Sequence, residues 1–116
     1  MPQITVEYSE SLRDTFDRRG FALALHPVVV ETVAAKIPAC KTRFVAAEDF
    51  VAGDGAEQDA AIVHVGVALL PGRTDEAKAR LSEAVLGLVE QHLKPTDSPL
   101  HISAEVRDLD VSYRKR

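Results

Sequence analysis

The chain has 116 residues, of which 46% are hydrophobic and 28% are charged, a size and composition typical of a single globular domain. Its net charge of −4 is spread without a long block of one sign, which argues against nucleic acid as the main partner. No apolar run approaches the roughly 18 to 20 residues that span a bilayer, so we expect no membrane role. Because Cys40 is the single cysteine and the N-terminus lacks a signal-peptide pattern, we expect a cytoplasmic protein.

The first part of the chain predicts a strand, a loop and a helix. Residues 4–8 alternate apolar and polar side chains, which indicates a strand. The polar, turn-rich residues 9–20 predict a loop that Gly20 closes. Apolar residues then recur at helical spacing over residues 21–36, and Pro27 should either bend this helix or lie near its first turn.

A second strand is expected within residues 40–50, where the alternation returns. Lys41 and Arg43 lie two residues apart in it, so both side chains should point to the same face of the sheet. A turn at residues 51–59 leads into residues 61–70, AIVHVGVALL. This nearly continuous apolar run, rich in β-branched residues, predicts a central strand that is buried on both faces.

The longest helix is expected over residues 74–93. Thr74 is placed as its N-cap, acidic residues occupy the first turn, and Pro95 follows its end. One stripe of this helix carries Ala77, Leu81, Val85, Leu88 and His92. A last alternating strand is expected within residues 99–111, and we interpret the basic residues after it as a solvated chain end.

The order of these elements predicts one α+β domain over residues 1–116, built from two βαβ halves of about 1–55 and 56–116. Right-handed crossovers would form a four-stranded mixed sheet with both helices on one face. The other face would then be uncovered. Because residues 61–70 are apolar in both directions, we expect self-association through that face, by a twofold or a threefold arrangement.

The stretches MPQITVEYS, KTRF, DAAIVHV and GRTDEAKARLSEAVLGLVEQHL follow one another in this order and span most of the chain. In their order and spacing, the chain resembles the 5-carboxymethyl-2-hydroxymuconate isomerases of the tautomerase superfamily. The resemblance implies a homotrimer of doubled βαβ protomers. It also implies an isomerase that acts on a small carboxylated substrate and needs neither a cofactor nor a metal.

The resemblance further implies roles for four residues. Pro2, exposed by removal of Met1, would be the general acid–base that moves a proton along an unsaturated keto acid. Lys41, Arg43 and Arg73 would bind the carboxylates of the substrate. Lysine at position 41 departs from the arginine that is more usual in the family, and it lacks the planar fork that binds a carboxylate with two hydrogen bonds.

This chemistry requires a base that is neutral at the working pH. A model α-amino group has a pKa of about 7.7 to 8.0 and a proline amine is more basic, so burial and nearby cations must lower the pKa of Pro2. Lys41, Arg43 and Arg73 could supply that charge, and the same cations would stabilise the enolate that forms between the two proton transfers.

Each of these cations also has a structural alternative. Lys41 and Arg43 could simply solvate one face of a strand. Arg73 precedes an N-cap, where a cation is mildly unfavourable, and this favours a ligand role. Of the remaining chemistry-bearing residues, His64 is expected to be a satisfied interior histidine and Cys40 a packing residue.

Two functions are therefore weighed. The first is the tautomerase, and the alternative is a non-catalytic oligomeric module of the same fold that binds a small ligand or has a structural role. The state of the N-terminus separates them, because the nitrogen of Pro2 is an amide and cannot act as a base if Met1 is retained.

Overall fold

The computed structural model describes residues 2–116, which form one four-stranded sheet and two α-helices. In chain order the elements are β1 (Gln3–Ser9), the 3-10 turn η1 (Glu10–Leu12), α1 (Arg18–Val33), the 3-10 turn η2 (Ile37–Ala39), β2 (Lys41–Ala47), β3 (Ala61–Leu69), α2 (Asp75–Gln91) and β4 (Leu100–Asp108). Neither helix combines the length and the apolar character that crossing a membrane requires.

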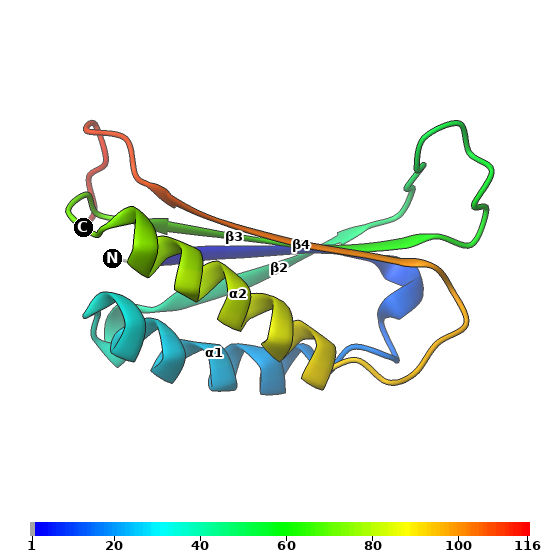
Figure 1. The fold of residues 1–116 in the computed structure, drawn as a ribbon, viewed down its shortest axis with the longest axis horizontal. Coiled ribbons are helices and arrows are strands. Elements are labelled where there is room, and N and C mark those ends of the chain that lie inside the picture. Colours follow the sequence, from blue (N-terminus) through cyan, green and yellow to red (C-terminus); the bar gives the residue numbers. More distant parts are fainter. Residues whose placement is uncertain (1) are drawn as a thin grey trace.

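The sheet has the strand order β2-β1-β3-β4. Each half of the chain forms a parallel pair, β1 with β2 and β3 with β4, and the halves join through the antiparallel pair of β1 with β3. Both helices lie on one face of the sheet (Figure 1). The predicted α+β fold, with a mixed sheet and two helices on a single face, is confirmed.

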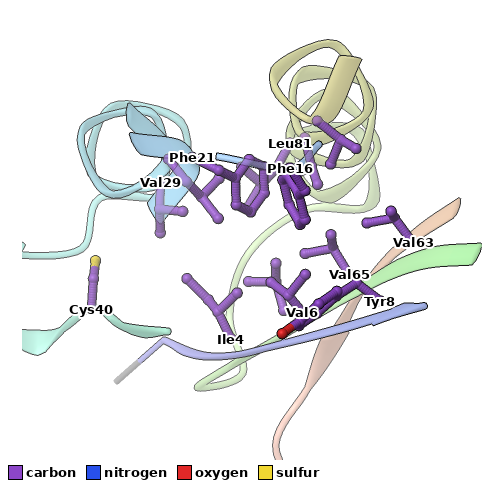
Figure 2. Close-up of a cluster of buried hydrophobic side chains, with 14 of the residues drawn as sticks. Ile4, Val6, Tyr8, Phe16, Phe21, Val29, Cys40, Val63, Val65 and Leu81 are labelled. Atoms are coloured by element: carbon purple, nitrogen blue, oxygen red, sulfur yellow. The ribbon is translucent and has the colours of Figure 1, made fainter. Parts of the chain in front are cut away.

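The core lies between the sheet and the helices. Alternate side chains of the two central strands point to the helices, where side chains of α1 and α2 meet them (Figure 2). The side chains involved include Ile4, Val6, Tyr8, Val63, Val65, Val67, Phe21, Leu25, Leu81 and Val85, all at most 2% exposed. The period of two in the strands and of about four in the helices therefore puts one apolar face of each element into this layer.

Helix α1 begins at Arg18, three residues earlier than the sequence predicts. Asp17 is its N-cap, and the Asp17 carboxylate accepts a hydrogen bond of 3.0 Å from the backbone N–H of Gly20. Gly20 therefore lies in the first helical turn and does not close a loop. A Cβ at position 20 would collide with the Asp17 carboxylate as it lies here, so a larger residue would require the Asp17 side chain to shift.

Pro27 lies inside α1 and not in its first turn. It has no N–H to donate to the carbonyl of Leu23, four residues earlier, so one hydrogen bond of the helix is missing there. Of the two positions that the sequence left open for Pro27, the structure has the internal one.

Helix α2 begins as predicted, because the Thr74 hydroxyl accepts a hydrogen bond of 3.1 Å from the backbone N–H of Ala77. Its buried stripe, however, continues from Val85 to Val89 and not to the predicted Leu88 and His92, and Leu88 is only partly buried beside the core. From Ala77 onward the buried residues are spaced four positions apart. His92 lies at the helix end, with its Nδ1 atom 2.7 Å from the carbonyl oxygen of Leu88.

The face of the sheet away from the helices is called the open face here. Contrary to the sequence-based expectation, it is mostly polar. Its central part carries Gln3, Thr5 and Glu7 of β1, Arg43 and Val45 of β2, His64, Gly66 and Ala68 of β3, and Glu105 and Arg107 of β4. Most strongly apolar positions of β3 point instead to the helices, and Ile62 is an exception on the open face. Within residues 2–116 the open face is therefore not a continuous apolar surface that would drive self-association.

Two individual predictions are also decided by this arrangement. His64 is not an interior histidine, because it lies on the open face with its Nδ1 atom 2.7 Å from the Ser103 hydroxyl. Cys40 is a packing residue as predicted: it is 7% exposed within the core cluster, and burial raises the pKa of its thiol.

Candidate active site

Pro2 is buried and immediately precedes β1. Its carbonyl oxygen accepts a hydrogen bond of 3.2 Å from the backbone N–H of Lys41, so the parallel pairing of β1 with β2 holds it beside the start of β2. In Figure 1 the N-terminus lies at the end of the sheet where the loop between β3 and α2 also lies. A proline is tolerated at this place because the first residue of a strand needs no ladder N–H.

Lys41 and Arg43 are exposed and share one face of β2, as predicted. Their side chains nevertheless have different partners. Arg43 is directed toward β1, where its Nη1 donates a hydrogen bond of 3.0 Å to the Oε1 atom of Gln3. Lys41 donates from Nζ to the backbone carbonyl of Pro38 at 3.4 Å. Of this pair, Arg43 is thus the cation that is hydrogen-bonded to Gln3, the residue that follows Pro2.

Arg73 lies in the loop between β3 and α2 and is bonded to backbone carbonyls. Its Nε donates to the carbonyl of Val33 and its Nη1 to that of Leu70, both at 2.9 Å. Val33 is the last residue of α1, where helix carbonyls lack partners and a positive charge is favourable. Arg73 therefore connects this loop to the end of α1 on the helix side, and the structure does not bring it together with Arg43 on the open face.

A cavity of about 480 Å³ lies on the open face, and Gln3, the residue that follows Pro2 in the sequence, is part of its lining. It contains three arginines and no acidic residue, its lining being Gln3, Thr5, Arg43, Gly66, Ala68, Arg107, Leu109, Tyr113 and Arg114. Gln3 connects two sides of it, because its amide accepts from Arg43 and donates to the Tyr113 hydroxyl at 3.2 Å. We call this feature the arginine cavity.

The sequence pointed to Arg43 but not to Arg107, Tyr113 or Arg114. Arg107 lies on the polar side of an alternating strand, a pattern that every exposed strand face shows. The chain after β4 was interpreted as a solvated end; Arg114 is exposed as expected, whereas Tyr113 is partly buried, and both line the cavity. The available signal was the basic character of the tail, but its position over the sheet depends on tertiary structure.

The comparison with protein families is decisive for the class of protein. The family model described as "CHMI: 5-carboxymethyl-2-hydroxymuconate isomerase" matches residues 2–116. The chain belongs to this family. It is accordingly an isomerase, and the resemblance seen in the sequence is confirmed.

Solved structures of similar fold agree with this membership in the isomerase family. A 5-carboxymethyl-2-hydroxymuconate isomerase from Deinococcus radiodurans R1 is 20% identical, with a TM-score of 0.83 over 98% of this chain and 88% of that one. A 5-carboxymethyl-2-hydroxymuconate delta-isomerase is 13% identical, with a TM-score of 0.84 over 100% of this chain and 87% of that one.

The "W0 fused 4-OT wild type symmetric trimer" is also similar, at 22% identity and a TM-score of 0.68 over 92% of this chain and 86% of that one. No curated protein sequence matches the chain. At these identities the structural likeness establishes a shared fold.

Proposed function

We propose that this isomerase moves a proton along an unsaturated keto or dienol carboxylate, such as 5-carboxymethyl-2-hydroxymuconate, with Pro2 as general acid–base and without a cofactor. The observation that carries the proposal is the family match over residues 2–116, which begins at Pro2. The arginine cavity at this end of β1 supports it, because Gln3, the residue that follows Pro2, lines the cavity together with cations that could bind a carboxylated substrate.

The reaction needs a proton removed at one carbon and returned at another, with the negative charge held on oxygen in between. In a chain without Met1, the burial of Pro2 would disfavour the protonated form of its amine, and a nearby cation would act in the same direction. A neutral amine could then accept the proton at the working pH and return it as an acid. The guanidinium groups would stabilise the enolate oxygen or the carboxylates beside it.

The free amine is the condition for this mechanism, and it can be tested directly. Protein from its own host would be checked by intact mass spectrometry, and a second preparation would retain Met1. We expect the trimmed protein to convert a 2-hydroxymuconate-type dienol, measured by ultraviolet absorbance, and the protein with Met1 to be inactive. Equal activity of the two preparations would exclude Pro2 as the base.

For Arg73 we expect the variant Arg73→Ala to raise KM for a carboxylated substrate and also to lower kcat. The lost charge would both bind the substrate and stabilise the enolate. The bonds of Arg73 to Val33 and Leu70 offer a purely structural alternative, in which thermal stability falls and the kinetic constants of the folded enzyme do not change. Measuring kcat, KM and Tm for Arg73→Ala separates the two, because an unchanged KM at lowered Tm would remove Arg73 from the substrate site.

We further propose that the protein is a homotrimer. This follows the fold relationship to a protein described as a symmetric trimer, and it does not follow from an apolar open face. Sedimentation equilibrium should give a mass near three times the 12.6 kDa of the chain. A mass near twice that value, or a stable monomer at micromolar concentration, would contradict the trimer.

A further inference from the structure

We propose that the arginine cavity binds both ends of a dicarboxylate or tricarboxylate, with Arg107 and Arg114 as carboxylate-binding residues in addition to Arg43. Its use for the substrate rests on the proposed function. The binding itself rests on the chemistry and the position of these three side chains.

The cavity is built by small residues between large cations. Across the sheet, Arg43 of β2 is in register with Thr5, Gly66 and Glu105, and the next row runs from Lys41 through Gln3 and Ala68 to Arg107. At their centre, β3 therefore contributes Gly66 and Ala68, and no other atom lies within 4 Å of the place where a Cβ of residue 66 would be. Arg43 and Arg107, which belong to the two outer strands, both line the cavity beside this low floor.

The third side of the cavity comes from the segment after β4. This segment is tied to the sheet, because the backbone N–H of Leu109 donates to the carbonyl of Leu69 at 2.6 Å and Tyr113 accepts from Gln3. Arg114 is held in the turn by donating to the backbone carbonyls of Val111 and Tyr113. In Figure 1 the segment rises from the sheet on the side opposite to the helices. Arg114 is thereby held beside the floor.

The charges of the cavity are not neutralised within the protein. Among residues 2–116, neither Arg43 nor Arg107 nor Arg114 has an ion pair. The acidic residues Glu7 and Glu105 line a neighbouring cavity, which shares Thr5, Gly66 and Arg107 with the arginine cavity. A negative ligand is therefore attracted to the arginine side and repelled from the other, which limits where it can lie.

The separation of the cations favours more than one carboxylate. Arg43 and Arg107 belong to the two outer strands, three strand spacings or about 14 Å apart at the backbone. A single carboxylate could bind the guanidinium group of only one edge strand, whereas two carboxylates on a short carbon chain could bind Arg43 and Arg107 at the same time. Guanidinium groups are suited to this because each can bind a carboxylate through two hydrogen bonds.

The test measures binding without reaction. Muconate is an unsaturated dicarboxylate without the keto or enol oxygen, and sorbate has the same carbon chain with a single carboxylate. Calorimetric titration of both therefore compares the affinity for a ligand with two carboxylates and for a ligand with one. We expect muconate to bind the natural protein at least about tenfold more tightly than sorbate, and Arg107→Ala to weaken muconate binding about tenfold. Arg114→Ala should act in the same direction, and Arg107→Lys should restore part of the loss.

The matched control is Arg80→Ala, which removes the same charge from an exposed position of α2 on the other side of the sheet. It should change muconate binding less than about twofold. Equal affinities for muconate and sorbate, or Arg107→Ala and Arg114→Ala variants that bind muconate like Arg80→Ala, would overturn the proposal.

The two proposals fail in different ways. Muconate binding that depends on Arg107, in a protein with a free Pro2 that isomerises no dienol, supports the cavity and contradicts the proposed reaction. Isomerisation with muconate binding that is insensitive to Arg107 and Arg114 supports the reaction and overturns the inference about the cavity.

Discussion

The variant Pro2→Ala is expected to lower kcat/KM for a 2-hydroxymuconate-type dienol by about 10² to 10⁴, the usual contribution of a positioned general acid–base. Alanine also leaves a free amine after removal of Met1, so the variant changes a rigid secondary amine into a mobile primary one. The conformation of the base and its basicity change together, whereas the cations on the open face are not altered.

The loss must be shown to come from the chemistry. Pro2 is buried, so the thermal unfolding of Pro2→Ala is measured beside its kinetics, and muconate titration reports whether the arginine cavity still binds. We expect a small change of Tm and unchanged muconate affinity. Turnover equal to that of the natural protein, in a variant whose N-terminus is confirmed by mass, would exclude the mechanism.

The largest expected effect on stability is that of Phe21→Ala, at about 3 to 5 kcal/mol of unfolding free energy. Phe21 is fully buried where α1 meets the sheet and α2. Its ring centre lies 5.7 Å from that of Phe16 and 6.1 Å from that of His92, so its removal leaves a cavity that three segments line. The rigid sheet below prevents these segments from closing the space.

Leu23→Ala is the matched control for this variant, because Leu23 lies on the same helix and is 59% exposed. Its effect should stay within about 0.5 kcal/mol. Both free energies come from urea denaturation at one fixed protein concentration, since association would make stability depend on concentration. A cost below about 1 kcal/mol for Phe21→Ala would mean that α1 does not pack as Figure 2 shows.

Local patterns in the sequence predicted most of the elements correctly. The alternation in β1 and β2, the Thr74 cap and the apolar spacing of α2 depend on residues close together in the chain, where geometry is fixed by periods of two and 3.6. The start of α1 was missed although its signal was present. Asp17 is a good N-cap, but Gly20 was interpreted as a breaker, and its contact with the Asp17 carboxylate is visible only in three dimensions.

The candidate site divides in the same way. The place of Pro2 directly ahead of a strand and the shared face of Lys41 and Arg43 could be derived from position and strand period, whereas the role of Pro2 as a base was implied only by the family resemblance. The partners of Arg73 could not, because the end of α1 reaches this loop only when both helices pack on one sheet face. The arginine cavity depends on still more distant parts of the chain: the strand order places β2 and β4 at the two edges, and the register sets Gly66 and Ala68 between their cations. Neither the strand order nor the register is encoded in any short stretch of sequence, since strand pairing is decided by the burial of the whole helix-facing layer.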